Sequence, residues 1–165
     1  MTNEARFVAD VMLGKLTKWL RVMGIDVIYD PDTFGAPLLQ YAERSGRVVL
    51  TRDHGLLRRQ GPAQRLYIES DYYHEQVRQV VQAFRLTGSI QIFTRCLRCN
   101  TALRAIAKSL VSGRVPPYVY ATQMTFKYCA ICDQLYWGGT HRDNMLRQLQ
   151  TILIGLPAIS SETLR

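Results

Sequence analysis

The stretch RFVADVMLGKLTKWLRVMG, residues 6–24, sets the pattern from which the fold is predicted. It opens with Arg6–Ala9, a short and mostly apolar run that is typical of a buried strand. Gly24 ends the stretch as a helix stop signal. Between them, apolar residues recur at helical spacing, at Leu13, Leu16, Leu20 and Met23. The stretch therefore predicts one strand followed by one amphipathic helix.

The same alternation of strand and helix continues to about residue 92. Further strands are expected at residues 26–29, 47–50 and 65–68. Helices are expected at about residues 38–44 and through Val77–Phe84. Strands that are separated by helices at this spacing along the sequence pair in parallel through right-handed crossovers. We therefore predict an α/β domain with a parallel sheet over residues 1–92.

From Ile92 onward the pattern changes to short β segments, which predicts a second unit over residues 93–165. Its stretch VPPYVY, residues 115–120, is expected to be rigid and extended. Thr140–Asp143 resembles a capping box, and a helix is expected from there to about Leu153. The tail that ends at Arg165 is expected to be frayed.

The chain has four cysteines, which form two matched pairs: CLRC at residues 96–99 and CAIC at residues 129–132. Each pair places two thiolates on one tight turn, and two such turns supply the four soft ligands of a tetrahedral zinc site. Such a site has no open position for water, so its expected role is structural. Iron remains an alternative metal. The predicted ligands are Cys96, Cys99, Cys129 and Cys132.

Other readings of the cysteine pairs depend on the cellular compartment. Two disulfides would need an oxidising compartment, and residues 1–6 do not resemble a secretory signal, so a cytoplasmic location is expected. A thioredoxin-like motif would normally occur once, after a strand of the main sheet.

No run of about 18 apolar residues is present, so we expect no membrane span.

The net charge of +8 is unevenly distributed along the chain. Residues 1–92 hold 12 Lys/Arg and 10 Asp/Glu, whereas residues 93–165 hold 9 and 3, a surplus of 6. Arginine supplies 17 of the 21 basic residues, and its planar fork suits bidentate phosphate contacts. Nucleic acid is therefore the natural anionic partner, although a basic composition also serves solubility alone. The candidate RNA contacts are Lys18, Arg21, Arg58, Arg59, Arg98 and Arg114.

Three acidic residues follow predicted strands: Asp10, Asp53 and Asp71. In a parallel sheet, ligands bind beyond the carboxyl ends of the strands. Carboxylates gathered there without histidine form a hard oxygen site suited to Mg²⁺ or Mn²⁺. Each of the three also precedes a helical segment, where Asp is a favoured N-cap, so helix capping is the alternative role.

Several motifs together resemble one family, that of the C-terminal RNase domain of the Mut-seven exonuclease, which belongs to the PIN-like ribonucleases. The resemblance covers about residues 6–150. The matching stretches are FVADVMLGKL at 7–16, RVVLTRD at 47–53, the two cysteine pairs, GRVPPYVY at 113–120 and YWGGTH at 136–141.

This resemblance implies a PIN-like fold, a three-layer parallel sheet with helices on both faces, followed by a small zinc ribbon and a C-terminal helix. It implies an endoribonuclease that cuts single-stranded RNA and leaves a 5′-phosphate. Asp10, Asp53 and Asp71 would bind Mg²⁺ or Mn²⁺, and Lys15 and Arg52 would hold the scissile phosphate.

One departure from the family pattern concerns an acid at the start of the second helix. This chain has FGAPLL at residues 34–39, and its nearest acids are Asp30 and Asp32. Those acids would substitute for the missing ligand, or one ligand would be absent. A noncatalytic RNA-binding module is therefore the alternative to a ribonuclease, and a protein-docking module is a third hypothesis.

Overall fold

The computed structural model describes residues 5–156, so the predicted fraying of the tail lies outside the described residues. No helix in this range is long and apolar enough to cross a membrane. The first elements in chain order are β1 (Phe7–Ala9), α1 (Gly14–Val22), β2 (Val27–Tyr29), α2 (Ala36–Ser45), β3 (Val48–Thr51), α3 (His54–Arg58), β4 (Arg65–Tyr67) and α4 (Tyr73–Ala83).

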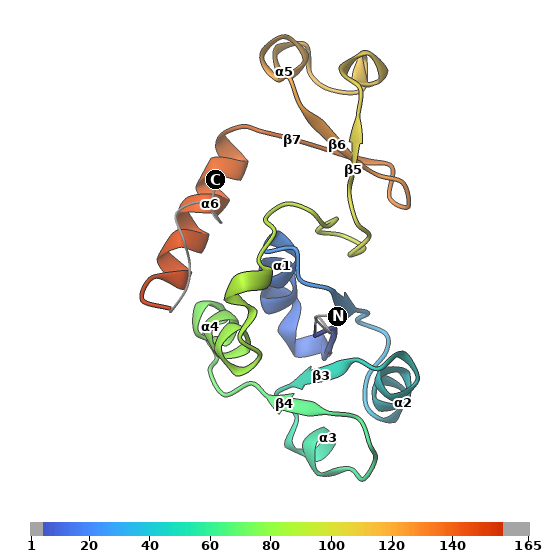
Figure 1. Ribbon diagram of the computed structural model, residues 1–165. Coiled ribbons are helices and arrows are strands. Elements are labelled where there is room, and N and C mark those ends of the chain that lie inside the picture. The colour runs from blue at the N-terminus through green and yellow to red at the C-terminus, as the bar shows by residue number, and fades with distance from the viewer. Residues whose placement is uncertain (1–4, 157–165) are drawn as a thin grey trace.

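The later elements form a small antiparallel ribbon and a long helix (Figure 1). They are β5 (Arg104–Ile106), α5 (Pro117–Thr122), β6 (Phe126–Cys129), β7 (Gln134–Trp137) and α6 (Thr140–Leu153). Short 3₁₀ turns occupy Val11–Leu13, Leu86–Ser89 and Lys108–Val111.

The main sheet has four parallel strands in the order β2-β1-β3-β4. Phe7 of β1 pairs with Val27 on one side and with Val48 on the other. Strands β1 and β3 are therefore the central pair. Because all four strands run the same way, their carboxyl ends meet at one edge of the sheet, which we call the carboxyl edge. The amino ends meet at the opposite edge, the amino edge.

Alternate residues of the central strands face opposite sides of the sheet, as the period of a strand requires. Phe7, Ala9 and Leu50 pack in one core with residues of α1, α4 and α6. Val8 and Val49 pack in a second core with residues of α2 and α3. Helices therefore cover both faces, and the predicted three-layer α/β architecture is confirmed (Figure 1).

The ribbon sheet has the order β5-β6-β7, and all its pairs are antiparallel. Its core is small, with four buried residues: Val111, Val115, Phe126 and Leu135. So few buried side chains give little hydrophobic stabilisation, and modules of this size commonly depend on a bound metal.

Two local predictions in this half of the chain were wrong. Residues 117–122 form α5, not an extended segment, because Pro117 occupies the first helical turn, where its missing N–H costs nothing. The capping box also fails, because the N-cap of α6 is Gly139 and no side chain caps the helix. Thr140 lies within the first turn of α6 instead.

Helix α6 follows the ribbon in sequence but packs beside α4 of the sheet domain (Figure 1). Met145, Leu149 and Ile152 belong to the same core as α1 and α4. Arg78 of α4 donates hydrogen bonds of 2.8 Å to the Ile152 and Ile154 carbonyls at the end of α6. The helix therefore ties the segment after the ribbon to the sheet. The division of the chain at residue 92 stays a prediction.

Candidate metal centre and acidic sheet edge

The four cysteines converge on one point. Their Sγ atoms all lie within 4.8 Å of one another, and none forms a disulfide. The Sγ atoms of Cys99 and Cys129 are 3.4 Å apart. Four sulfurs at about 2.3 Å from a tetrahedral zinc ion lie about 3.8 Å apart. The group therefore fits a structural zinc ion held by Cys96, Cys99, Cys129 and Cys132.

Side chains outside the ligand set orient two of the sulfurs. The hydroxyl of Tyr136 lies 3.1 Å from the Cys96 Sγ and accepts a hydrogen bond from the Leu97 N–H. The Thr101 Oγ1 lies 3.2 Å from the Cys99 Sγ. Such outer contacts fix ligand geometry and tune ligand basicity. No local pattern predicts that Tyr136 lies beside the cysteines, although this residue opens the YWGGTH motif.

The thiols differ in acidity. Burial on its own raises the pKa of Cys99, but hydrogen bonds with Thr101 and the neighbouring thiols lower it to about 6. The pKa of Cys132 is raised to about 12, first by its hydrogen bond with Cys99 and then by burial. The Cys99 thiol is therefore more acidic than the Cys132 thiol when no metal is bound. A divalent cation would deprotonate all four thiols and share the negative charge among them.

Arg21 attaches the first cysteine turn to α1. Its guanidinium donates to the Leu97 and Arg98 carbonyls at 3.0 and 2.9 Å, and to the Val27 carbonyl at 3.1 Å. The residue is only 4% exposed. Burial against backbone acceptors thus replaces the RNA contact predicted for Arg21. Nothing near Arg21 in the sequence reveals the cysteine turn that covers it.

A polar network around Asp26 completes the attachment at the amino edge. The Asp26 carboxylate accepts hydrogen bonds from Arg47 at 2.6 and 3.2 Å and from Asn100 at 2.8 Å. Arg95 lies 3.7 Å from the same carboxylate. The Asn100 side-chain oxygen also accepts from the N–H of Val27, the first residue of β2. The cysteine centre is therefore fixed to the amino edge of the sheet.

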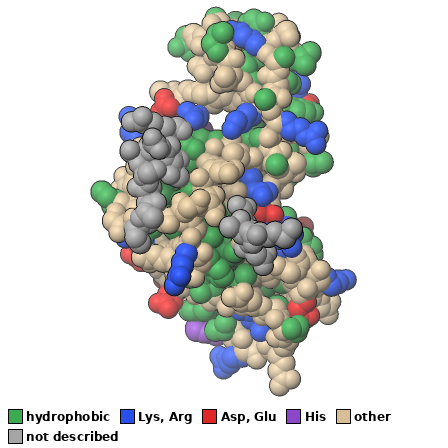
Figure 2. All heavy atoms as spheres, in the orientation of Figure 1, with side chains coloured by type: hydrophobic (Ala, Val, Ile, Leu, Met, Phe, Trp, Pro, Cys, Tyr) green, Lys and Arg blue, Asp and Glu red, His purple; other side chains and the backbone are tan. Residues whose placement is uncertain are grey.

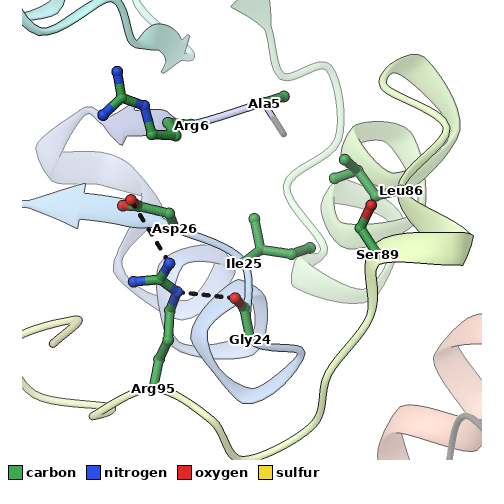
Figure 3. Close-up of a pocket in the computed structure, with 8 residues that line it drawn as sticks. All are labelled: Ala5, Arg6, Gly24, Ile25, Asp26, Leu86, Ser89 and Arg95. Carbon is green, nitrogen blue, oxygen red and sulfur yellow. Dashed lines mark hydrogen bonds and ion pairs between the residues drawn. The ribbon is translucent and has the colours of Figure 1, made fainter. Parts of the chain in front are cut away.

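A cavity of about 100 Å³ lies beside this network (Figure 3). Figure 3 shows Arg95 reaching from the ribbon side to the Asp26 carboxylate and to the Gly24 carbonyl. The cavity therefore belongs to the attachment of the ribbon and not to the carboxyl edge. It is lined by Ala5, Arg6, Gly24, Ile25, Asp26, Leu86, Ser89 and Arg95.

Asp26→Asn is expected to destabilise the protein at neutral pH but not in acid. Burial raises the pKa of Asp26, but the hydrogen bonds and charges of Arg47, Asn100 and Arg95 outweigh it, so the folded-state pKa is lowered. The stabilisation is therefore present above the unfolded pKa, about 3.9, and is lost as pH falls through the folded value. Urea unfolding at pH 7 should show a loss of about 1.5–3 kcal/mol.

The exposed Asp32→Asn is the matched control, and we expect it to change the unfolding free energy at neither pH. A loss from Asp26→Asn that is equally large in strong acid would contradict the charge-based account of this network.

At the carboxyl edge, Asp10 directly follows central strand β1. It is 5% exposed, and its side chain does not cap the 3₁₀ turn that follows. The Asp10 Oδ2 accepts a 2.8 Å hydrogen bond from the hydroxyl of Thr51, the last residue of β3. Helix capping therefore does not account for this buried carboxylate.

Asp53 lies two residues beyond β3 and has the capping role that its position allowed. Its Oδ1 accepts a 2.7 Å hydrogen bond from the Gly55 N–H, at the start of α3. Its own N–H donates to the Thr51 hydroxyl oxygen at 2.9 Å. Thr51 thus links Asp10 and Asp53 across the two central strands. This bridging hydroxyl lies in the RVVLTRD motif, but only the tertiary structure reveals its contacts.

Asp71 is held by Arg52. The two side chains form an ion pair of 2.5 Å, and the Asp71 side chain is 85% exposed. The Arg52 guanidinium also donates to the backbone carbonyls of Ile68, Glu69 and Ser70. Arg52 therefore fixes the loop after β4, so both of these predicted site residues already have partners within the protein.

The three predicted acids do not form one tight group. Between residues 5 and 156, the four cysteines are the only group of three or more His, Cys, Asp or Glu side chains that could hold a metal ion. Asp30 follows β2 at the same edge, but its carboxylate accepts from the Asp32 N–H and the Thr33 hydroxyl. It therefore stabilises its own turn.

The remaining predicted basic contacts lie on the surface. Lys15 is exposed in the first turn of α1, which begins at the carboxyl edge. Arg114 pairs with Asp133 at 2.7 Å on the ribbon. The other predicted contacts that are exposed are Lys18, Arg58, Arg59 and Arg98. Figure 2 shows Lys and Arg side chains around the junction of the ribbon and the main sheet with its helices.

Comparisons with known proteins give one finding. The family model described as Mut7-C RNAse domain matches residues 5–149, which is most of the chain. No curated protein and no solved structure matches the chain significantly. The matched range includes the parallel sheet, the ribbon with its four cysteines, and most of α6.

Proposed function

Because the chain belongs to the Mut7-C RNAse domain family, we propose that it is a metal-dependent ribonuclease that hydrolyses single-stranded RNA at the carboxyl edge. The observation that carries this proposal is the pair Asp10 and Asp53. They follow the two central parallel strands and are linked through Thr51. A ligand-binding position at this edge is the general rule for parallel α/β sheets.

The donor set at this edge fits a small divalent cation. Oδ1 of Asp10 and Oδ2 of Asp53 accept no hydrogen bond from the described residues, and neither carboxylate forms an ion pair there. Mg²⁺ commonly binds one or two carboxylates and completes its shell with water and substrate phosphate. When bound, such an ion supplies charge neutralisation at the phosphodiester and activation of water.

The side chains around these acids have distinct proposed roles. Thr51 orients the Asp10 carboxylate by donating to one of its oxygens. Lys15 is the exposed cation at the start of α1 and would contact the phosphate. Arg52 would hold the loop that carries Asp71, since contact with phosphate would compete with its four existing acceptors. The ribbon would add basic surface through Arg98 and Arg114.

The test of this function is the cleavage of end-labelled single-stranded RNA in Mg²⁺, in Mn²⁺ and in chelator. We expect metal-dependent cutting that leaves 5′-phosphate ends, with a duplex of the same sequence cut more slowly. Cutting that persists after chelation, or that leaves a cyclic phosphate, would contradict the proposed metal-dependent hydrolysis.

A second function, a noncatalytic RNA-binding module, is favoured by one observation. Within the described residues, Asp10 and Asp53 do not belong to any group of three or more His, Cys, Asp or Glu side chains that could hold a metal ion. This alternative predicts salt-sensitive RNA binding without cleavage in any metal. The same assay distinguishes the two functions when binding is recorded beside cleavage.

A further inference from the structure

The carboxyl edge carries large apolar side chains that are exposed to solvent. Phe34 is 63% exposed, Met12 is 62% exposed and Tyr72 is 65% exposed. Each lies in the segment after a different strand: Met12 after β1, Phe34 after β2 and Tyr72 after β4. Exposed apolar groups concentrated in one region mark binding surfaces more often than scattered ones do.

The strand order places the two aromatic residues on either side of the acids. Phe34 follows one outer strand and Tyr72 follows the other, while Asp10 and Asp53 follow the two strands between them. Three strand spacings of about 4.8 Å separate the outer strands by about 14 Å. A polymer that crosses the edge at right angles to the strands would meet an aromatic residue, the carboxylates and a second aromatic residue.

Both aromatic residues lie in loops that internal hydrogen bonds fix. The N–H of Tyr72 donates to the Ser70 hydroxyl at 3.0 Å, and Arg52 holds the same loop. The turn before Phe34 is closed by the Thr33 hydroxyl, which donates to Asp30 at 2.6 Å. Ordered loops lose less conformational entropy when a ligand binds.

We propose that Phe34 and Tyr72 are stacking sites for unpaired bases on the two sides of the phosphate at Asp10 and Asp53. This inference rests on the proposed function, and it gives a physical cause for selecting single strands. An aromatic ring stacks on a base face only when that face is not covered within a duplex. The exposed Lys15 would contact the backbone between the two stacked bases.

The ribbon offers a matched comparison. Tyr118 in α5 is 76% exposed. The segment around it is basic, because residues 93–139 hold six Lys/Arg and one Asp/Glu. The cysteine turns of the ribbon are attached to the amino edge, so Tyr118 lies outside the proposed path across the carboxyl edge. Tyr118→Ala is therefore the control for removing an aromatic ring that is at least as exposed.

The experiment measures binding without added Mg²⁺ or Mn²⁺, so that no cleavage occurs, with a short fluorescent oligoadenylate and an abasic phosphodiester of equal length. Phe34→Ala and Tyr72→Ala should each weaken oligoadenylate binding about tenfold and leave abasic binding unchanged. Tyr72→Phe, which keeps the ring, and Tyr118→Ala should bind like the wild type.

Equal affinity of the wild type for the two probes, or unchanged binding in both alanine variants, would overturn the stacking sites. Weaker oligoadenylate binding in Tyr118→Ala alone would also overturn them, because the bases would then stack on the ribbon. The binding result is independent of the cleavage assay. A protein that shows the stacking effects but never cuts RNA would refute the proposed ribonuclease activity and still support the stacking sites.

Discussion

Cys99→Ser is expected to abolish stable zinc binding and to unfold the ribbon formed by β5, β6 and β7. The four sulfurs lie within 4.8 Å of one another, whereas the ribbon core has four buried side chains. Zinc binding contributes about 10–16 kcal/mol to the folding of zinc-finger peptides, far more than so small a core supplies. Native mass spectrometry should show one zinc per wild-type chain and none per variant chain.

The sheet domain should keep its fold in this variant. Its strands, α1 and α4 form a separate core, and α6 adds Leu149 and Ile152 to that core directly. Limited proteolysis should therefore cut first within residues 100–138 and spare the sheet. Thr101→Val is the control, because it removes a contact with the Cys99 sulfur but no ligand. A Cys99→Ser protein that retains one zinc and a protected ribbon would contradict the four-thiolate centre.

Asp10→Asn is expected to lower the cleavage rate by more than about a hundredfold. Removing partners that only orient a metal ligand commonly costs about 10–100-fold, so neutralising the ligand itself should cost more. The amide can still accept the Thr51 hydrogen bond, so the fold should be preserved. Single-turnover cleavage of labelled RNA in Mg²⁺ measures the effect, and circular dichroism checks the fold.

Asp143→Asn removes an acid from the exposed first turn of α6 and serves as the matched control. Its cleavage rate should equal that of the wild type. If Asp10→Asn also cuts at the wild-type rate, the carboxyl edge is not the catalytic site and the proposed mechanism fails.

The layered sheet could be predicted from sequence because its signals are local. The apolar runs at residues 7–9 and 48–50 and the helical spacing of Leu13, Leu16 and Leu20 each lie within one element. The spacing of the paired cysteines likewise predicts a metal site without any tertiary information. The wrong prediction of an extended segment at residues 115–120 shows the limit of local signals, because Pro117 suits both an extended segment and the first turn of a helix.

The candidate sites depend on contacts that no local pattern contains. Arg21 looked like a surface cation, yet its acceptors at Leu97 and Arg98 lie 76 and 77 residues away in sequence. The Thr51 bridge to Asp10 spans 41 residues. The attachment of the cysteine centre to the amino edge likewise depends on Asn100 reaching Val27, 73 residues distant.

The two candidate centres therefore lie at opposite edges of one sheet. Helix α1 spans the distance between them, with Lys15 near the carboxyl edge and Arg21 under the cysteine turn. This placement separates the expected structural role of the thiolate site from the proposed catalytic role of the carboxyl edge. We expect the thiolate site to stabilise the ribbon and the proposed hydrolysis to take place at the carboxyl edge.

The most direct test of the ribonuclease is the cleavage of labelled single-stranded RNA by Asp53→Asn beside the wild type, with binding recorded in the same samples. Asparagine caps helices as well as aspartate does, so the Gly55 hydrogen bond is kept while the charge is removed. We predict cutting by the wild type in Mg²⁺, none in chelator, and none by the variant despite normal RNA binding. RNA binding without cutting in both proteins, in every metal, would contradict the ribonuclease and leave a noncatalytic RNA-binding module.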